Sequence, residues 1–233
     1  MADVNRFKLH FKINDMTTLS FADISKLKKI GGWCESHTMN LINFAITECM
    51  KNGEEYLEIG SYCGRSLVSA LINNDRRAQV IEPFDLFLPD GDVIQYEWEE
   101  TVDLFQMQDR VTLHKMDFMN FNKRLPPIGV FYYDGDHELG YTYHGLKKFE
   151  PYLADNAIII VDDYNIHGEE PSVMHKIKYC LKFKEYGYAY SSKPVKADVH
   201  RWLAENKNAE LIGITPHLNG QAVIIYNRNK LDD

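Results

Sequence analysis

The stretch YLEIGSYCGRS, residues 56–66, decides the fold class of this chain. An apolar, β-favouring run ends at Ile59, and Gly60 and Gly64 then permit a sharp turn into a segment with helical spacing from about Arg65 to Asn74. A strand followed at once by a glycine turn and a helix is typical of an α/β sheet. The same succession of strand and helix continues along the chain.

Near-continuous apolar runs follow this unit and alternate with segments of helical spacing near 94–108 and 139–153. Strands buried on both faces in this way are typical of a parallel sheet with helices on both sides. The predicted strands are EYLEI (55–59), AQVIE (78–82), RVTLHKM (110–116), IGVFYYD (128–134) and NAIIIVDD (156–163).

The pattern changes near the C-terminus, where AELIGITPHL (209–218) and QAVIIYNRN (221–229) are separated only by Asn219 and Gly220. A tight turn between two such runs predicts an antiparallel pair at the end of the sheet. The predicted fold is therefore α/β, mostly parallel, with a C-terminal antiparallel hairpin and helices on both faces.

Two helices are predicted before the first strand, at 16–30 and 36–52, the second with Ser36 as its N-cap. A length of 233 residues with 45% hydrophobic content suits one sizeable core, so we expect a single domain. Within it, 1–52 would form an N-terminal helical cap region and 53–233 the α/β core. The stretch EPFDLFLPDGD (82–92) predicts a loop, because it carries Pro, Gly and Asp.

The 34 acidic residues outnumber the 26 basic ones, and the net charge of −8 opposes binding to a nucleic-acid backbone. The longest apolar runs are too short to span a bilayer, and the N-terminal residues lack a secretory signal. We therefore expect a soluble, cytoplasmic protein with no nucleic-acid or membrane partner. The cysteines agree with this, because they show neither disulfide nor zinc-finger spacing; they are Cys34, Cys49, Cys63 and Cys180.

In an open parallel sheet, ligands bind beyond the carboxyl ends of the strands. The G-x-x-x-G spacing after the first strand differs from the G-x-G-x-x-G that cradles a pyrophosphate. Glu58 precedes this turn, and its carboxylate would repel phosphates but favour a sulfonium cation, which points to S-adenosylmethionine. Glu82 could accept hydrogen bonds from both hydroxyls of a ribose, whereas Asp117 could either receive the amine of adenine or cap a helix.

Carboxylates also end two later strands, with Asp134 after the first and Asp162 and Asp163 after the second. If these strands are neighbours, about 5 Å apart, the three carboxylates converge and repel one another unless a cation or protons are bound. Oxygen ligands without His or Cys suit a hard divalent ion, with magnesium first and calcium or manganese as alternatives. The competing interpretation is that these aspartates cap the helices that follow.

Asp136 and His137 follow closely in YYDGDHELG (132–140). Either side chain could take a proton from a substrate hydroxyl that a nearby cation has polarised. Both are therefore candidates for the catalytic base.

Four stretches, taken as an ordered set within residues 35–180, resemble the class I, S-adenosylmethionine-dependent O-methyltransferases that need a divalent metal. They are YLEIGSYCGRSLVSAL (56–71), IEPF (81–84), YYDGDH (132–137) and FEPYLADNAIIIVDDYN (149–165). The resemblance extends to the catechol O-methyltransferase group and to the group that methylates sugars of macrolide and aminocoumarin antibiotics. It implies a Rossmann-like methyltransferase sheet with 53–233 as the cofactor-binding core.

The resemblance also implies roles for single residues. The catechol group has Asn at the third metal position, so Asp163 matches the sugar-modifying group instead. The catalytic lysine of the catechol group falls on His137, whereas the proposed base of the sugar group falls on Asp136, and His137 could alternatively contact the cofactor or cap a helix. The implied cofactor residues are Glu58, Gly60, Ser61, Tyr62, Ser66, Glu82, Asp117 and Asp134, and the implied metal ligands are Asp134, Asp162 and Asp163.

The implied reaction moves a methyl group in line from the sulfonium to a hydroxyl of a small molecule, such as a catechol or a sugar diol, and depends mainly on positioning. Alternative hypotheses are a non-catalytic S-adenosylmethionine-binding module and a metal-independent N-methyltransferase. Aromatic residues near 1–35 could form a homodimer contact or a lid. Trp98 could line the pocket of the methyl acceptor or pack on the core. The residues expected to line this acceptor pocket are Trp33 and His37, the loop 83–98 with Phe84, Phe87, Tyr96 and Trp98, and the stretch 164–171 with Tyr164, Asn165 and His167.

Overall fold

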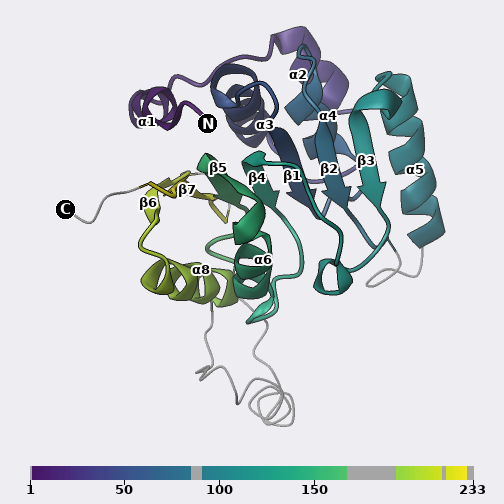
Figure 1. Cartoon of the computed structure of the whole chain (residues 1–233). Coiled ribbons are helices and arrows are strands. Elements are labelled where there is room, and N and C mark those ends of the chain that lie inside the picture. Colours follow the sequence, from purple (N-terminus) through teal and green to yellow (C-terminus); the bar gives the residue numbers. More distant parts are fainter. Residues whose placement is uncertain (1, 85–90, 167–192, 217–218, 230–233) are drawn as a thin grey trace.

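The computed structural model describes residues 2–84, 91–166, 193–216 and 219–229. Within these residues a seven-stranded sheet runs through the molecule in the order β3-β2-β1-β4-β5-β7-β6 (Figure 1). Its strands are β1 (Glu55–Ile59), β2 (Ala78–Ile81), β3 (Val111–His114), β4 (Ile128–Tyr133), β5 (Leu153–Val161), β6 (Ala209–Ile214) and β7 (Ala222–Asn227).

The first five strands are parallel, whereas β7 is antiparallel to both β5 and β6. Every residue of β2 and β4 is buried, which explains why these strands are unbroken apolar runs in the sequence. The predicted α/β class with a C-terminal antiparallel hairpin is confirmed. The predicted two-residue turn is too short, because β6 ends at Ile214 and a hydrogen bond of 3.0 Å from the Thr215 N–H to the Gln221 carbonyl extends the pairing by one step.

Helices cover both faces of the sheet, as predicted. Successive strand residues point to opposite faces, so Tyr56 and Ile158 join one core while Leu57 and Ile159 join the other. The first core packs against α1 (Val4–Ile13), α2 (Phe21–Leu27), α3 (Ser36–Phe44) with its π-helical extension Ala45–Cys49, α4 (Arg65–Leu71) and α5 (Gly91–Leu104). The second core packs against α6 (Tyr141–Phe149) and α8 (Pro194–Glu205), which lie side by side (Figure 1).

The N-terminal helices differ in detail from the prediction. The sequence prediction omitted α1, which Asp3 caps by accepting the Arg6 N–H at 3.0 Å. The predicted helix 16–30 shortens to α2, because Ser20 and Asp23 form a capping box that sets its start. The predicted N-cap at Ser36 is wrong, since Ser36 is the first helical residue of α3. No helix among the described residues is long and apolar enough to cross a membrane.

The start of α6 is fixed by a side chain from α8. Asp198 is fully buried, and its Oδ2 accepts the backbone N–H groups of Gly140 at 2.7 Å and Tyr143 at 3.2 Å. Such N–H groups have no partner within their own helix, so the carboxylate supplies the cap. Asp198 thereby holds the segment that leads from β4 into α6.

Candidate active site at the carboxyl end of the sheet

Four neighbouring strands end in a row at one edge of the sheet. Ile59 of β1 pairs with Ile81 of β2 and with Tyr133 of β4, and Tyr133 pairs with Val161 of β5. Ligands of open parallel sheets bind at this edge. The next residue of each strand therefore stands in the same row, namely Gly60, Glu82, Asp134 and Asp162.

The turn after β1 lies directly against the end of β4. The Asp134 N–H donates to the Ile59 carbonyl at 2.9 Å. Gly60 has a φ of +82°, and a Cβ at this position would lie 1.9 Å from the carbonyl oxygen of Asp134. Glycine is required here, because any side chain would push the two loops apart.

Glu82 organises the same turn. Its Oε2 accepts the backbone N–H groups of Ser61 at 2.6 Å and Tyr62 at 2.9 Å, and its Oε1 accepts that of Phe84 at 3.1 Å. The carboxylate lies one strand away from Gly60, at the edge where a ribose was predicted. The sequence did not indicate its bonds to the turn, because they depend on the pairing of β1 with β2.

Glu58 is the residue before the last in β1, and it is fully buried. It accepts the hydroxyls of Tyr56 and Ser66, each at 2.7 Å. Burial raises the pKa of Glu58 to about 7, while the hydroxyl donors partly oppose this shift. A cation placed nearby would favour the ionised form, and the role of Glu58 in facing a sulfonium stays a prediction.

Aromatic side chains support the turn from two sides. Trp98 is buried and donates its Nε1–H to the Ser61 hydroxyl at 3.0 Å, which favours the packing role over a place in the acceptor pocket. Trp33 is 81% exposed, and its ring lies 5.2 Å from the ring of Tyr62. Tyr62 has a φ of +49°, so the backbone of the turn is left-handed at this residue as well.

Asp117 lies after β3 and caps a short 3-10 turn. Its Oδ1 accepts the Met119 N–H at 2.8 Å, as the helix-cap alternative predicted. Its place after β3, next to β2, leaves the adenine role as a prediction.

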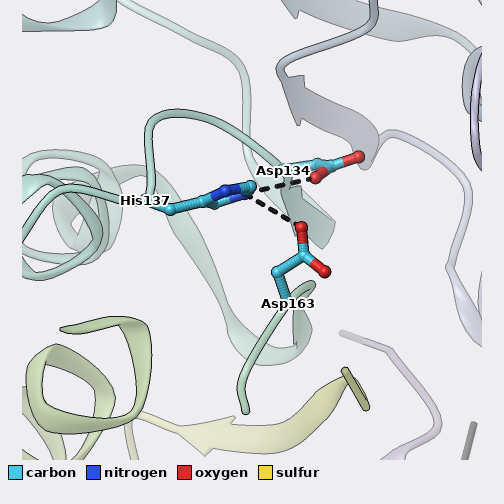
Figure 2. Close-up of side chains that lie close together, drawn as sticks. All are labelled: Asp134, His137 and Asp163. Carbon is cyan, nitrogen blue, oxygen red and sulfur yellow. Dashed lines mark ion pairs between the residues drawn. The ribbon is translucent and has the colours of Figure 1, made fainter. Parts of the chain in front are cut away.

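Asp134, His137 and Asp163 lie together beyond β4 and β5 (Figure 2). The Nε2 atom of His137 is 3.2 Å from Asp163 Oδ2 and 3.9 Å from Asp134 Oδ1. One ligand atom from each residue lies within 4.8 Å of the other two. Asp163 also has a φ of +52°, and its Oδ1 accepts Asn219 Nδ2 at 2.7 Å.

Asp162 lies beside this group and makes several hydrogen bonds of its own. Its Oδ1 accepts Gln221 Nε2 at 2.7 Å and the Asp163 N–H at 2.8 Å. Its Oδ2 accepts the hydroxyl of Tyr132, which also lies 3.4 Å from Asp134 Oδ2. The structure thus brings two of the three predicted metal ligands together with His137, while Asp162 lies beside them.

The electrostatics of this group fit a divalent cation. Burial, together with the charges of Asp162 and Asp163, raises the pKa of Asp134 to about 8, although His137 opposes the shift. Burial alone would lower the pKa of His137, but Asp134 and Asp163 outweigh it and raise that pKa. The His137 Nε2 atom is also buried without a hydrogen-bond partner among the described residues. Two carboxylates and an imidazole nitrogen thus face the same point, and a divalent cation bound there would take the place of the proton on His137.

Asp136 lies in the same loop but is oriented by different contacts. Its Oδ1 accepts the Glu138 N–H at 2.8 Å, and its carbonyl accepts the Tyr133 hydroxyl at 3.1 Å. Burial raises the pKa of Asp136. A raised pKa suits a group that takes up a proton, so Asp136 stays a candidate base beside His137.

The residues expected to line the acceptor fall into three groups. Tyr164 and Phe84 are buried, like Trp98, and His37 is hydrogen-bonded through Nε2 to Gln221 Oε1 at 2.9 Å. Trp33 and Tyr96 are largely exposed. Phe87 and His167 lie outside the residues that the structure describes.

Comparison with known proteins agrees with this architecture. Residues 57–164, from within β1 to just beyond β5, match a family model described as a methyltransferase domain. A search of curated protein sequences found no match. Solved structures with the same fold include a protein of Corynebacterium glutamicum, with a TM-score of 0.66, 11% identity, and coverage of 99% of this chain and 100% of that one. An O-methyltransferase of Bacillus cereus in complex with SAH has a TM-score of 0.60, 11% identity, and coverage of 93% of this chain and 94% of its own. TomG, an O-methyltransferase of Streptomyces achromogenes involved in tomaymycin synthesis, in complex with SAM, has a TM-score of 0.57, 11% identity, and coverage of 97% of both chains.

The comparisons show a match to a methyltransferase domain over residues 57–164 and a fold shared with O-methyltransferases of known structure. The matched segment contains the whole row of strand-end residues, together with His137 and Asp163. At these identities the solved structures establish the fold, and the chemistry must be argued from the site itself.

Proposed function

We propose that this protein transfers a methyl group from S-adenosylmethionine to a hydroxyl oxygen of a small molecule, with a divalent cation bound at the acidic group. The observation that carries the proposal is the contact between Gly60 and the backbone of Asp134. It places the turn expected to hold the methyl donor directly beside the residues expected to hold the acceptor oxygen. In-line transfer depends on this closeness, since it requires positioning more than covalent help from the protein.

The glycine turn would bind the cofactor. Glu58 would face the sulfonium with its carboxylate, and the open backbone at Gly60 would allow the ligand to approach closely. Ser61, Tyr62 and Ser66 belong to the same turn and the start of α4 and would surround the methionine part. Glu82 would accept from the ribose hydroxyls while it keeps its bonds to the turn, because a carboxylate has about four acceptor positions.

Asp134 and Asp163, with Asp162 beside them, would hold the cation. A bound divalent ion supplies Lewis acidity that lowers the pKa of a coordinated hydroxyl. The chain itself would then orient the acceptor through these carboxylates and take up the released proton on Asp136 or His137. A vicinal diol, such as a catechol or a sugar diol, suits two-point binding at this site.

Calorimetric titration of S-adenosylhomocysteine into the purified chain tests the proposal, first with a divalent cation and then with excess chelator. We expect S-adenosylhomocysteine to bind in both conditions. We also expect the chain to bind the divalent cation, and Asp163→Asn to weaken that metal binding. Asp155→Asn is the matched control, because the Asp155 side chain is half exposed and its Oδ1 pairs only loosely with Arg228 Nε, at 3.8 Å.

Absence of S-adenosylhomocysteine binding in wild type would contradict the proposal. Cofactor binding without metal binding would leave a metal-independent methyltransferase. Cofactor and metal binding without methyl transfer to any diol would favour the non-catalytic binding module.

A further inference from the structure

We propose that His137 is a metal ligand together with Asp134 and Asp163, and that this nitrogen donor makes the site select a first-row transition ion, such as Mn²⁺ or Co²⁺, over Mg²⁺. The inference deepens the proposed function, because it concerns the cation of the same site. It replaces the all-oxygen set of Asp134, Asp162 and Asp163 that the sequence predicts.

The distances match a shared ion. Two ligands that bind one transition ion at about 2.1 Å, with a bond angle between 90° and 110°, lie about 3.0–3.4 Å apart. His137 Nε2 and Asp163 Oδ2 are 3.2 Å apart, within this range. His137 Nε2 and Asp134 Oδ1, at 3.9 Å, are close enough to reach it by a small side-chain rotation. Figure 2 shows the imidazole facing both carboxylates from the loop that follows β4.

The three aspartates differ in the hydrogen bonds that their carboxylates accept. Asp163 accepts Asn219 through Oδ1, which turns Oδ2 toward His137. Asp162 instead accepts bonds through both oxygens, from Gln221, the Asp163 N–H and Tyr132. Its carboxylate would have to give up one of these donors to join the ion.

The surroundings of the His137 nitrogen also fit a metal ligand. Its Nε2 is buried, and the polar atoms that it faces are the two carboxylates, Asp163 Oδ2 at 3.2 Å and Asp134 Oδ1 at 3.9 Å. An imidazole nitrogen suits Mn²⁺, Co²⁺, Fe²⁺ or Zn²⁺, whereas Mg²⁺ prefers six oxygen ligands and keeps its waters. A ligated His137 has its Nε2 lone pair occupied, so Asp136 becomes the proton acceptor of the proposed reaction.

Selectivity in wild type is not decisive by itself, because Co²⁺ binds most sites more tightly than Mg²⁺. The test is therefore a comparison of variants by calorimetry with CoCl₂, MnCl₂ and MgCl₂ on the chelator-treated chain. We expect His137→Ala to weaken Co²⁺ and Mn²⁺ binding by about 10- to 100-fold, as loss of groups in metal sites commonly does, and to leave Mg²⁺ binding nearly unchanged. His10→Asn on α1 is the matched control and should change none of the three.

A second measurement does not depend on the folding of a variant. The proton NMR spectrum of the Co²⁺-loaded wild type should show a strongly shifted, exchangeable imidazole N–H resonance from a ligated histidine. Absence of that resonance, or an equal loss of Mg²⁺ and Co²⁺ affinity in His137→Ala, would overturn the inference. Binding of S-adenosylhomocysteine, measured separately, shows whether the proposed function fails instead.

Discussion

Gly60→Ala is the substitution that most directly tests the contact between the glycine turn and the acidic group. A residue with a Cβ at the left-handed φ of +82° costs about 1–2 kcal/mol. The new methyl group would also lie 1.9 Å from the Asp134 carbonyl oxygen. Backbone on both sides must move to relieve that overlap, which costs about 1–3 kcal/mol more. We therefore expect Gly60→Ala to lower the free energy of unfolding by about 2–5 kcal/mol, a large part of the total for an ordinary domain.

Gly53→Ala separates the conformational cost of a Cβ at positive φ from the cost of the overlap with Asp134. Gly53 has nearly the same φ, +85°, but a Cβ there would meet nothing within 4 Å. This variant should lose only the conformational cost, about 1–2 kcal/mol. Urea unfolding followed by circular dichroism gives the free energies, and calorimetry with S-adenosylhomocysteine gives the effect on the site.

We expect Gly60→Ala to be clearly less stable than Gly53→Ala and to bind S-adenosylhomocysteine more weakly, whereas Gly53→Ala keeps its affinity. Equal destabilisation of the two variants would refute the close approach of the turn to Asp134. Unchanged cofactor affinity in a folded Gly60→Ala protein would refute the role of this turn in binding.

Three further predictions concern buried polar groups. Without metal, the free energy of unfolding should fall as pH rises from about 5 to 8: the pKa values of Glu58 and Asp134 are raised in the folded state to about 7 and about 8, so the folded protein binds more protons in this window. Glu58 alone, shifted from 4.5 to about 7, accounts for about 3 kcal/mol, and urea unfolding across this range that showed a rising profile would contradict the burial argument. Trp98→Phe should lower the free energy of unfolding by about 1–3 kcal/mol and weaken S-adenosylhomocysteine binding, because the buried Ser61 hydroxyl loses its donor. Thermal unfolding and calorimetry measure the two effects, and an unchanged affinity for S-adenosylhomocysteine would contradict this prediction. Asp198→Ala should be less stable than Asp198→Asn by at least about 2 kcal/mol, since only Asn keeps an acceptor for the two N–H groups at the start of α6, and equal unfolding midpoints would speak against the cap.

The sheet could be predicted because its strands are buried on both faces and therefore stand out as apolar runs. The antiparallel end was also predictable from the two C-terminal runs, whereas their order in the sheet, β5-β7-β6, was not. The helices were harder. Asp3, Phe7 and Phe11 mark the start and the apolar spacing of α1, and Pro194 marks α8, but short amphipathic segments rich in charge give a weak period.

The candidate site was predictable only as a set of strand ends. The pairing of β1 with β2 and β4 brings Gly60, Glu82 and Asp134 to one edge, as the order of elements implied. Side-chain orientation depends on contacts that are distant in sequence. Gln221, just before β7, donates to Asp162 across 59 residues and so helps to orient its carboxylate. No local pattern shows that bond, so the sequence did not indicate how the Asp162 carboxylate is oriented.

A crystal structure of the chain soaked with S-adenosylhomocysteine and Mn²⁺ tests the central claim most directly. We expect the product to lie over the carboxyl ends of β1 and β2, with its ribose at Glu82 and its sulfur facing the ion held by Asp134 and Asp163. A product bound elsewhere on the chain, or no product at saturating concentration, would contradict the account of this edge as a methyl-transfer site.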